Sequence, residues 1–115
     1  MNANELRFNN LVSIEGEVMT IKMIGETEVY AEGMNTDEYF ISDVEPIPLT
    51  EEWIVRSELE KMPESEYTMN TYDFCGFKLW CNNGKFLFAD KIEIETVHHL
   101  QNLFYDLKKR ELTIN

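Results

Sequence analysis

The sequence predicts an α+β fold in which short strands come first and a helix closes the chain. Three observations support this. Of the 115 residues, 43% are hydrophobic and 12% aromatic, which is typical of a globular protein with a packed core. Polar and apolar residues alternate over short stretches in the first 45 residues, whereas Val97–Leu107 has apolar residues at helical spacing. The length fits one domain over residues 1–115: an acidic strand-rich half at 1–45, a proline joint and helix at 46–62, and a hairpin plus C-terminal helix at 63–115.

The first part of the chain is predicted to form four strands separated by turns at Glu15-Gly16, Gly25-Glu26 and the polar stretch after Gly33. In the second strand, Met19, Ile21 and Met23 are expected to share one face. Strands of this length and spacing favour a small antiparallel barrel or curled sheet of the SH3-like type. The predicted strands are Leu11–Ile14, Val18–Ile24, Glu28–Glu32 and Glu38–Val44.

The segment EPIPLTEEW (Glu45–Trp53) marks the end of this sheet. Pro46 and Pro48 cannot lie in a central strand and hold the chain extended. Thr50 is a suitable N-cap, and acids follow it, so a central helix is predicted from about Glu51 until Pro63 ends it. Its apolar stripe would contain Val55, Leu59 and Met62. We interpret the segment as a rigid joint rather than a linker or docking peptide.

The second half returns to strands and ends in an amphipathic helix. Asn83-Gly84 predicts a type I′ hairpin between two strands. Thr96 is expected to cap the last helix, and Lys108–Arg110 to occupy its last turn. The predicted strands are Tyr67–Phe74, Gly76–Cys81, Lys85–Asp90 and a short one within Lys91–Glu95, and the predicted helical stripe is Val97, Leu100, Leu103, Phe104 and Leu107. The predicted core of the whole chain is Val12, Ile14, Ile21, Val29, Phe40, Ile41, Trp53, Leu79, Phe86, Phe88, Leu100, Phe104 and Leu107.

The net charge of −12 is unevenly distributed along the chain. Residues 1–60 contain 14 acids and 3 bases, a net charge of −11, whereas residues 61–115 contain 8 acids and 7 bases, a net charge of −1. Direct binding of nucleic acid or of an anionic membrane by the first half is not expected, because phosphates would be repelled. A basic protein partner would be attracted.

Acids recur two residues apart in the sequence, as in Glu15/Glu17 and Glu26/Glu28. On a strand, residues two apart share a face at about 6.6 Å, similar to the spacing of neighbouring phosphates along a nucleic-acid strand. Such a surface would suit a nucleic-acid mimic that occupies the basic groove of a partner, although solvated acidic strand faces are also common. The predicted acidic binding surface is Glu15, Glu17, Glu26, Glu28, Tyr30, Glu32, Asp37 and Glu38.

Three segments carry a resemblance to a known family: LRFNNLV (Leu6–Val12), PIPLTEEW (Pro46–Trp53) and VHHLQNLFYDL with ELTI (Val97–Leu107, Glu111–Ile114). The chain resembles a family of small uncharacterised proteins of Bacteroidales genomes, often found in phages or mobile elements. The resemblance spans nearly the whole chain and implies no activity. Members commonly have glycines soon after the first helix turn and near the end of the last helix. This chain has IVRSELEK and DLKKREL there, so we expect both helices to run longer.

An alternative is chemistry at Cys75, Cys81, His98 and His99. These residue types bind zinc, but five residues between the cysteines is wider than the usual zinc knuckle, and adjacent histidines on a helix point about 100° apart. A thiol enzyme would need a cysteine and a histidine close together in the fold. We therefore expect reduced, buried thiols, with no catalytic residues, no metal and no cofactor.

The sequence thus predicts a non-enzymatic acidic interaction protein of phage or mobile-element type. Its partner would be a basic, nucleic-acid-binding protein, and its sharpest form an inhibitor of a host defence nuclease, such as an anti-CRISPR protein. The alternatives are the small Cys/His metal or thiol enzyme and a structural or assembly subunit. A cytoplasmic location is expected, because no apolar stretch approaches the roughly 20 residues that cross a bilayer and the start does not resemble a signal peptide.

Overall fold

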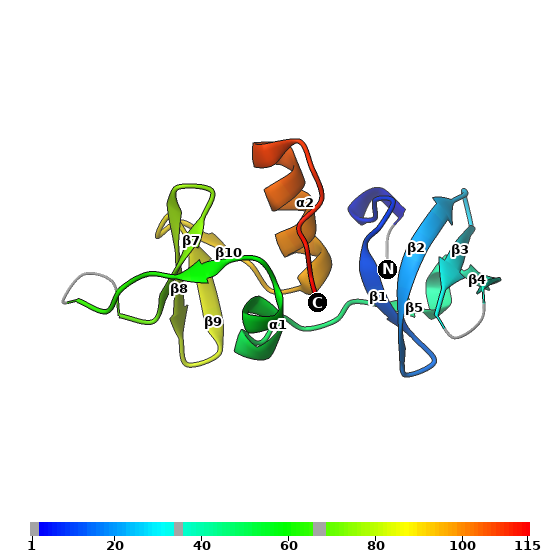
Figure 1. Ribbon diagram of the computed structural model, residues 1–115. Helices are drawn as coiled ribbons and strands as arrows, with labels where there is room; N and C mark the ends of the chain where they lie inside the picture. The colour runs from blue at the N-terminus through cyan, green and yellow to red at the C-terminus, as the bar shows by residue number, and fades with distance from the viewer. Residues whose placement is uncertain (1–2, 34–35, 66–68) are drawn as a thin grey trace. The chain divides into compact units, whose positions relative to one another are not determined.

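The computed structural model has an α+β fold with two antiparallel sheets and two α-helices in the described residues, which are 3–33, 36–65 and 69–115 (Figure 1). Its contacts divide the chain into two compact units. Unit 1 comprises Met1–Pro48 and Thr96–Asn102, and unit 2 comprises Leu49–Glu95 and Leu103–Asn115. The single domain over 1–115 stays a prediction.

Unit 1 contains a five-stranded sheet in the order β4-β3-β2-β1-β5. β4 and β5 lie at its two edges, so the sheet is not closed, which rules out the barrel alternative of the prediction and leaves the curled sheet as a prediction. The predictions for the first three strands are confirmed to within one residue. The elements are the 3-10 turn η1 (Ala3–Glu5), β1 (Leu11–Ile14), β2 (Glu17–Ile24), β3 (Glu28–Glu32), β4 (Thr36–Phe40), the 3-10 turn η2 (Ile41–Asp43) and β5 (Val44–Glu45).

The fourth predicted strand, Glu38–Val44, is wrong in its second half. Ile41 turns inward into η2, and its N–H donates to the carbonyl of Thr27 at 2.9 Å. The chain then returns beside β1 as β5, with Val44 opposite Ile14. Phe40 was expected in the core but is exposed, because it lies opposite Glu28 on the outward face of the sheet.

A β-bulge at Lys22 overturns another prediction. Ile21 pairs with Ala31, but the next pair is Met23 with Tyr30, so Lys22 is an extra residue in β2. One extra residue reverses the inward and outward alternation. Met23 therefore points outward with Tyr30 instead of inward with Met19 and Ile21. The buried cluster of unit 1 consists of Leu6, Val12, Ile14, Met19, Ile21, Val29, Ala31, Ile41 and Val44.

Unit 2 contains a five-stranded meander in the order β10-β9-β8-β7-β6. The hairpin turn at Asn83-Gly84 is confirmed, since both residues have positive φ (50° and 79°), as a type I′ turn requires. Tyr67 and Thr68 of the predicted strand 67–74 lie outside the described residues. The elements are α1 (Glu51–Arg56), β6 (Glu60–Lys61), β7 (Thr71–Phe74), β8 (Phe77–Asn82), β9 (Lys85–Phe88) and β10 (Ile92–Glu93), with the later part of α2 (Val97–Lys108).

The helix predicted to continue from Glu51 towards Pro63 is wrong in length, because α1 ends at Arg56. Ser57 ends it: its hydroxyl donates to the carbonyl of Ile54 at 2.6 Å and accepts from the N–H of Leu59 at 3.2 Å. The following backbone pairs elsewhere, with the N–H of Glu58 donating to the Thr113 carbonyl at 2.9 Å. These tertiary hydrogen bonds outweigh the helix preference of residues 57–62.

The shortened helix changes the exposure of its predicted stripe and of Trp53. Val55 is exposed, while Leu59 remains buried in extended chain. Trp53, predicted in the core, is half-buried beneath the Arg56 guanidinium, which lies 4.5 Å from the ring centroid.

Helix α2 begins as predicted after Thr96, whose hydroxyl accepts the N–H of His99 at 3.2 Å. It ends at Lys108, because Lys109 adopts positive φ (59°) even though it is not glycine. The prediction that Lys109 and Arg110 lie in the last helix turn is therefore wrong. In unit 2, Phe104 packs edge-on against Phe74, with ring centroids 5.9 Å apart, whereas Leu107 is exposed rather than in the core.

The proline segment is held by backbone hydrogen bonds in both units. In unit 1 the N–H of Val97 donates to the Ile47 carbonyl at 2.9 Å, and in unit 2 the N–H of Leu49 donates to the Glu95 carbonyl at 2.9 Å. Ile47 and Leu49 are both buried, while the prolines are exposed. The segment is therefore an integral part of the packed structure on each side of Pro48.

Candidate protein-binding surface

All eight predicted acidic-surface residues belong to unit 1, and strand β3 organises them. Glu28, Tyr30 and Glu32 are exposed on one face of β3, while Val29 and Ala31 are buried on the other. This alternation follows from the two-residue period of a strand that covers a core. The predicted faces of β3 are confirmed.

Neighbouring strands add residues to the outward face of β3. Tyr30 lies between Met23 of β2 and Glu38 of β4, and Glu28 lies opposite Phe40. Directly opposite residues on a sheet have Cβ atoms about 4.5–5.5 Å apart, so the side chains of each cross-strand pair are neighbours on the same surface. We call Met23, Glu26, Glu28, Tyr30, Glu38 and Phe40 the outer face, whereas Ile24 is paired with Val29 and belongs to the opposite pleat.

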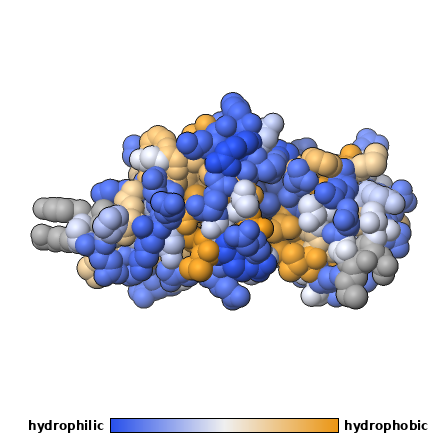
Figure 2. Space-filling view, viewed as in Figure 1, coloured by the Kyte–Doolittle hydropathy of each residue, from blue (hydrophilic) through white to orange (hydrophobic). Residues whose placement is uncertain are grey.

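A groove open to solvent lies beside the β2–β3 turn, where it borders the outer face, and it encloses about 330 Å³. The turn between β2 and β3 forms one end of it, where the N–H of Gly25 donates to the Glu28 carbonyl at 2.8 Å. Three acids and no base line the groove, together with apolar side chains. Figure 2 shows orange apolar side chains reaching a largely hydrophilic surface. The lining residues are Met23, Ile24, Gly25, Glu26, Thr27, Glu28, Val29, Tyr30 and Glu38.

Three other predicted acids, Glu15, Glu17 and Asp37, form a second group around Tyr39. Partial burial of the ring raises the pKa of Tyr39, and the nearby carboxylates of Asp37, Glu15 and Glu17 raise it further. Asp37 lies opposite Ala31 and so belongs to the pleat opposite to that of Glu38. Its carboxylate accepts the Glu38 N–H at 2.8 Å, which covers a donor on the edge strand.

The expected phosphate-like spacing depends on both acids of a pair lying in one strand, and the structure does not place them so. Glu15 is in the β1–β2 turn with positive φ (52°), and Glu17 begins β2. Glu26 precedes β3, which contains Glu28. Along β3 itself Tyr30 separates the acids, so Glu28 and Glu32 are about 13 Å apart. The acids therefore alternate with aromatic and apolar side chains instead of forming a regular row.

The cysteines and histidines do not form a metal site in the described residues. No three His, Cys, Asp or Glu side chains there gather as ligands. Cys75 lies in the β7–β8 turn, with positive φ (56°), and Cys81 lies in β8; both are free thiols of unit 2. His98 and His99 are in the part of α2 that belongs to unit 1.

Neither thiol is activated. Burial raises the pKa of Cys75, although Lys108 opposes this shift. Burial also raises the pKa of Cys81 to about 12. The thiolate is the nucleophilic form of cysteine, so both environments disfavour covalent chemistry. Nothing in these surroundings favours the thiol-enzyme alternative.

A buried amide network in unit 1 was not predicted from the sequence. The side-chain NH2 of Asn10, which is fully buried, donates to Asn102 Oδ1 at 2.7 Å, and Arg7 Nε donates to the same oxygen at 3.1 Å. Gln101 accepts the N–H of Leu11 at 2.8 Å and donates to the Asn9 carbonyl at 3.1 Å. The segments LRFNNLV and VHHLQNL thus meet in space. The signal in the sequence was the presence of adjacent amide residues, Asn9-Asn10 and Gln101-Asn102, beside apolar residues that were expected to be buried.

His98 lies one helix turn before this network and is also buried. Its Nδ1 atom has no hydrogen-bond partner. Burial lowers the pKa of His98, while Glu5 opposes that shift and His99 adds to it. The neutral form of His98 is therefore favoured in the folded unit.

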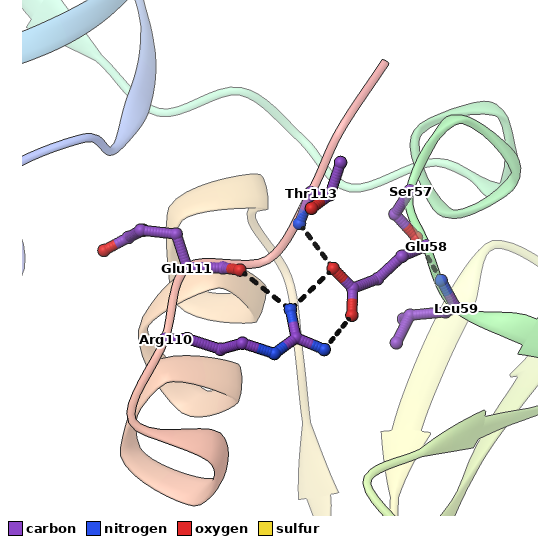
Figure 3. A network of polar contacts seen from close by, with 6 residues as sticks. All are labelled: Ser57, Glu58, Leu59, Arg110, Glu111 and Thr113. Carbon is purple, nitrogen blue, oxygen red and sulfur yellow. Dashed lines mark hydrogen bonds and ion pairs between the residues drawn. The ribbon is translucent and has the colours of Figure 1, made fainter.

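In unit 2, an ion pair links the chain after α1 to the C-terminal tail (Figure 3). Arg110 donates to both oxygens of Glu58, at 2.5 and 2.9 Å, and the N–H of Thr113 also donates to Glu58, at 2.9 Å. These hydrogen bonds, above all those from Arg110, lower the pKa of Glu58 to about 2. Arg110 was predicted in the last helix turn, but it follows the helix and fixes the tail.

The division into units revises the charge asymmetry. Unit 1 has 10 acids and 2 bases, a net charge of −8, and unit 2 has 12 acids and 8 bases, a net charge of −4. Unit 1 is still the more acidic, although the contrast is smaller than between residues 1–60 and 61–115. The segment 96–102, which joins unit 1, adds no charged residue.

Comparison of the chain with protein-family models, curated proteins and solved structures finds no match. The resemblance to the Bacteroidales and phage-associated family therefore stays a prediction. Neither α-helix of the described residues combines the length and the apolar character needed to cross a membrane.

Proposed function

We propose that this chain is a non-enzymatic interaction protein whose outer face binds a basic protein. The observation that carries the proposal is the composition of the groove on unit 1, where three acids and no base surround exposed apolar residues. Surfaces with complementary charge accelerate association and select partners. We further interpret the order β4-β3-β2-β1-β5, with a 3-10 turn before β5, as an SH3-like curled sheet that presents this face.

The sharper form of the proposal is inhibition of a nucleic-acid-binding effector, such as a host defence nuclease, by a phage or mobile-element protein of the anti-CRISPR type. Two considerations support it: the net charge of −8 on unit 1 and the family resemblance. A basic nucleic-acid-binding surface is the kind of partner that such a charge attracts. The acids would compete with nucleic acid for that surface while the apolar side chains supply further contact area.

Affinity capture with charge variants tests this function. The tagged chain is incubated with a nuclease-treated lysate of Bacteroidales cells, and bound proteins are identified by mass spectrometry. We expect a basic nucleic-acid-binding protein to bind the wild type and to be lost with Glu26→Lys plus Glu28→Lys. The captured effector is then assayed for nucleic-acid binding with and without the chain.

A matched control is available in unit 2. Glu93 and Glu95 are exposed acids with the same sequence spacing, so Glu93→Lys plus Glu95→Lys changes the net charge equally. This control should retain the partner. If both double variants lose it equally, only the net charge matters and the outer face is not the site. Recovery of nucleic acid alone, without a basic protein, would contradict the proposed function.

A further inference from the structure

Several large apolar side chains are exposed to solvent on the outer face. Met23 is 68% exposed, Phe40 60% and Tyr30 38%, and Ile24, at the end of β2 on the opposite pleat, is 37% exposed. Met23 and Tyr30 are directly paired, and both line the groove together with Ile24. Phe40 lies on the neighbouring strand, opposite Glu28. Contiguous exposed apolar side chains mark interaction sites more often than single ones do.

The bulge at Lys22 explains why Met23 is in this position. Regular pairing of β2 would direct Met23 to the same side as Met19 and Ile21, which are buried. The extra residue directs Met23 outward instead, while the Lys22 ammonium lies 5.5 Å from the centroid of the Phe8 ring. A bulge that re-aims a side chain is a recurrent feature next to functional sites.

The charges around these apolar residues indicate what can cover them. Glu26, Glu28 and Glu38 line the groove, and Glu32 continues the same face of β3. A second copy of this face would bring acids against acids, and a phosphate backbone or anionic membrane would be repelled. A cationic segment that also carries an apolar side chain complements both the acids and the exposed apolar residues of the groove. Strand addition at β4 is disfavoured, because Asp37 already accepts the Glu38 N–H.

We infer that the outer groove binds a peptide segment of its protein partner in which an apolar side chain is flanked by lysine or arginine. The apolar side chain contacts Met23 and Tyr30, and the cations lie beside Glu26, Glu28 and Glu38. This inference rests on the proposed function and specifies its contact chemistry. In this arrangement the apolar contact with Met23 and Tyr30 provides most of the specificity, and the three acids provide most of the salt dependence of binding.

Two synthetic peptides test it by nuclear magnetic resonance on the isotope-labelled full chain. One is a short peptide of Lys and Arg with a central Leu, and the other has Gly in place of that Leu. We expect the Leu peptide to bind about tenfold more tightly, as burial of a large part of one apolar side chain would give. The shifted amides should be those of residues 23–30 and 38–40.

Variants separate the two contributions. Met23→Ser should abolish the preference for Leu and leave weak, salt-sensitive binding of both peptides. Val18→Ser is the matched control, because Val18 is also an exposed apolar residue of β2 but does not line the groove. It should keep the preference. Glu28→Gln plus Glu38→Gln should weaken both peptides and reduce the salt dependence.

The outcomes distinguish this inference from the proposed function. Equal, salt-sensitive binding of both peptides at the outer face would overturn the apolar recognition and leave the basic-partner function standing. A Leu preference that survives Met23→Ser, or amide shifts outside the outer face, would also overturn it. Failure of both peptides to bind at millimolar concentration would contradict both.

Discussion

The two units use similar sheets but different polar groups to hold their sequence-distant segments. In unit 1, the neutral amides of Asn10, Gln101 and Asn102, with one hydrogen bond from the Arg7 guanidinium, join residues 7–11 to helix α2. In unit 2, the Glu58–Arg110 ion pair joins the chain after α1 to the tail. The amides are mostly buried, whereas the Arg110 side chain is 55% exposed. Neutral groups can be buried once they are hydrogen-bonded, but a buried ion pair loses much hydration energy, so the charged network lies nearer to water.

Because of this contrast, we expect the stability of the two units to respond differently to acid and to mutation. A neutral amide network does not titrate, whereas a carboxylate with a lowered pKa does. Unit 1, however, contains the buried His98, and unit 2 contains an aromatic cluster in which Phe74 contacts Phe88 and Phe104.

The largest effect is expected from Phe74→Ala. Phe74 is fully buried, with its ring centroid 5.2 Å from that of Phe88 and 5.9 Å from that of Phe104. Its removal leaves a cavity and should lower the free energy of unfolding by about 3–5 kcal/mol. Amide hydrogen exchange should accelerate most in β7, β8 and β9. Phe77→Ala, half-exposed in the same hairpin, is the control and should cost about 1 kcal/mol or less.

In unit 1, Asn102→Ala should cost about 2 kcal/mol, because the buried side-chain NH2 of Asn10 loses its acceptor. Chemical denaturation followed by the amides of β1 and β2 measures the change. The cost should be the same at pH 5 and pH 8, since no group that titrates is removed. A cost that varies over this range would show that the amide network is coupled to a group that titrates between pH 5 and 8.

The buried His98 predicts acid sensitivity of unit 1. Its folded-state pKa is lowered by burial, so its contribution is complete above the unfolded pKa of about 6.5 and is lost as pH falls below it. The loss is at most about 1.4 kcal/mol per pH unit. His98→Gln should remove this slope between pH 7 and 5 for unit 1 amides. An unchanged slope would assign the acid sensitivity to another group.

The ion pair predicts a different window for unit 2. Glu58 has its folded-state pKa lowered to about 2, so its contribution is present above its ordinary value of 4.5 and is lost as pH falls from there towards 2. Glu58→Gln should destabilise unit 2 by about 1 kcal/mol at pH 7, a modest value because Arg110 is solvated. The difference from the wild type should shrink below pH 4.5, as measured by denaturation at successive pH values. A difference that stays constant down to pH 2.5 would contradict this role.

The smallest effect is expected at a pair of two-residue hairpin turns, one in each unit. Cys75 and Glu15 both occupy the first position of a two-residue turn, with φ of 56° and 52°. Asparagine tolerates this conformation better, so Cys75→Asn should stabilise unit 2, and Glu15→Asn unit 1, by about 0.5 kcal/mol each. Thermal unfolding checks both variants. A destabilising Cys75→Asn would show that the packing of the thiol outweighs the turn geometry.

The sequence predicted the regular parts of both sheets well. β1, β3 and the Asn83-Gly84 hairpin depend on alternation and turn chemistry within a few residues, which a local pattern contains. The predicted ends of α1 and β4 were wrong, because hydrogen bonds that the Glu58 and Ile41 N–H groups donate to the carbonyls of Thr113 and Thr27, outside the local pattern, decide them. The outward face of β3 was predicted, but the mixture of acids and apolar groups around it was not, since it depends on the bulge at Lys22.

The sequence by itself determined the α+β class, the acidic character of the first part and the positions of most strands and of α2, because composition and short-range periodicity specify these features. Only the tertiary structure decided which segments join in each unit and which side chains share a surface. It paired Asn10 with Asn102 and Glu58 with Arg110, and it turned Met23 outward beside Tyr30. The physical reason is that strand register, helix ends and hydrogen-bond partners depend on residues far apart in the chain, whose contacts outweigh local preference.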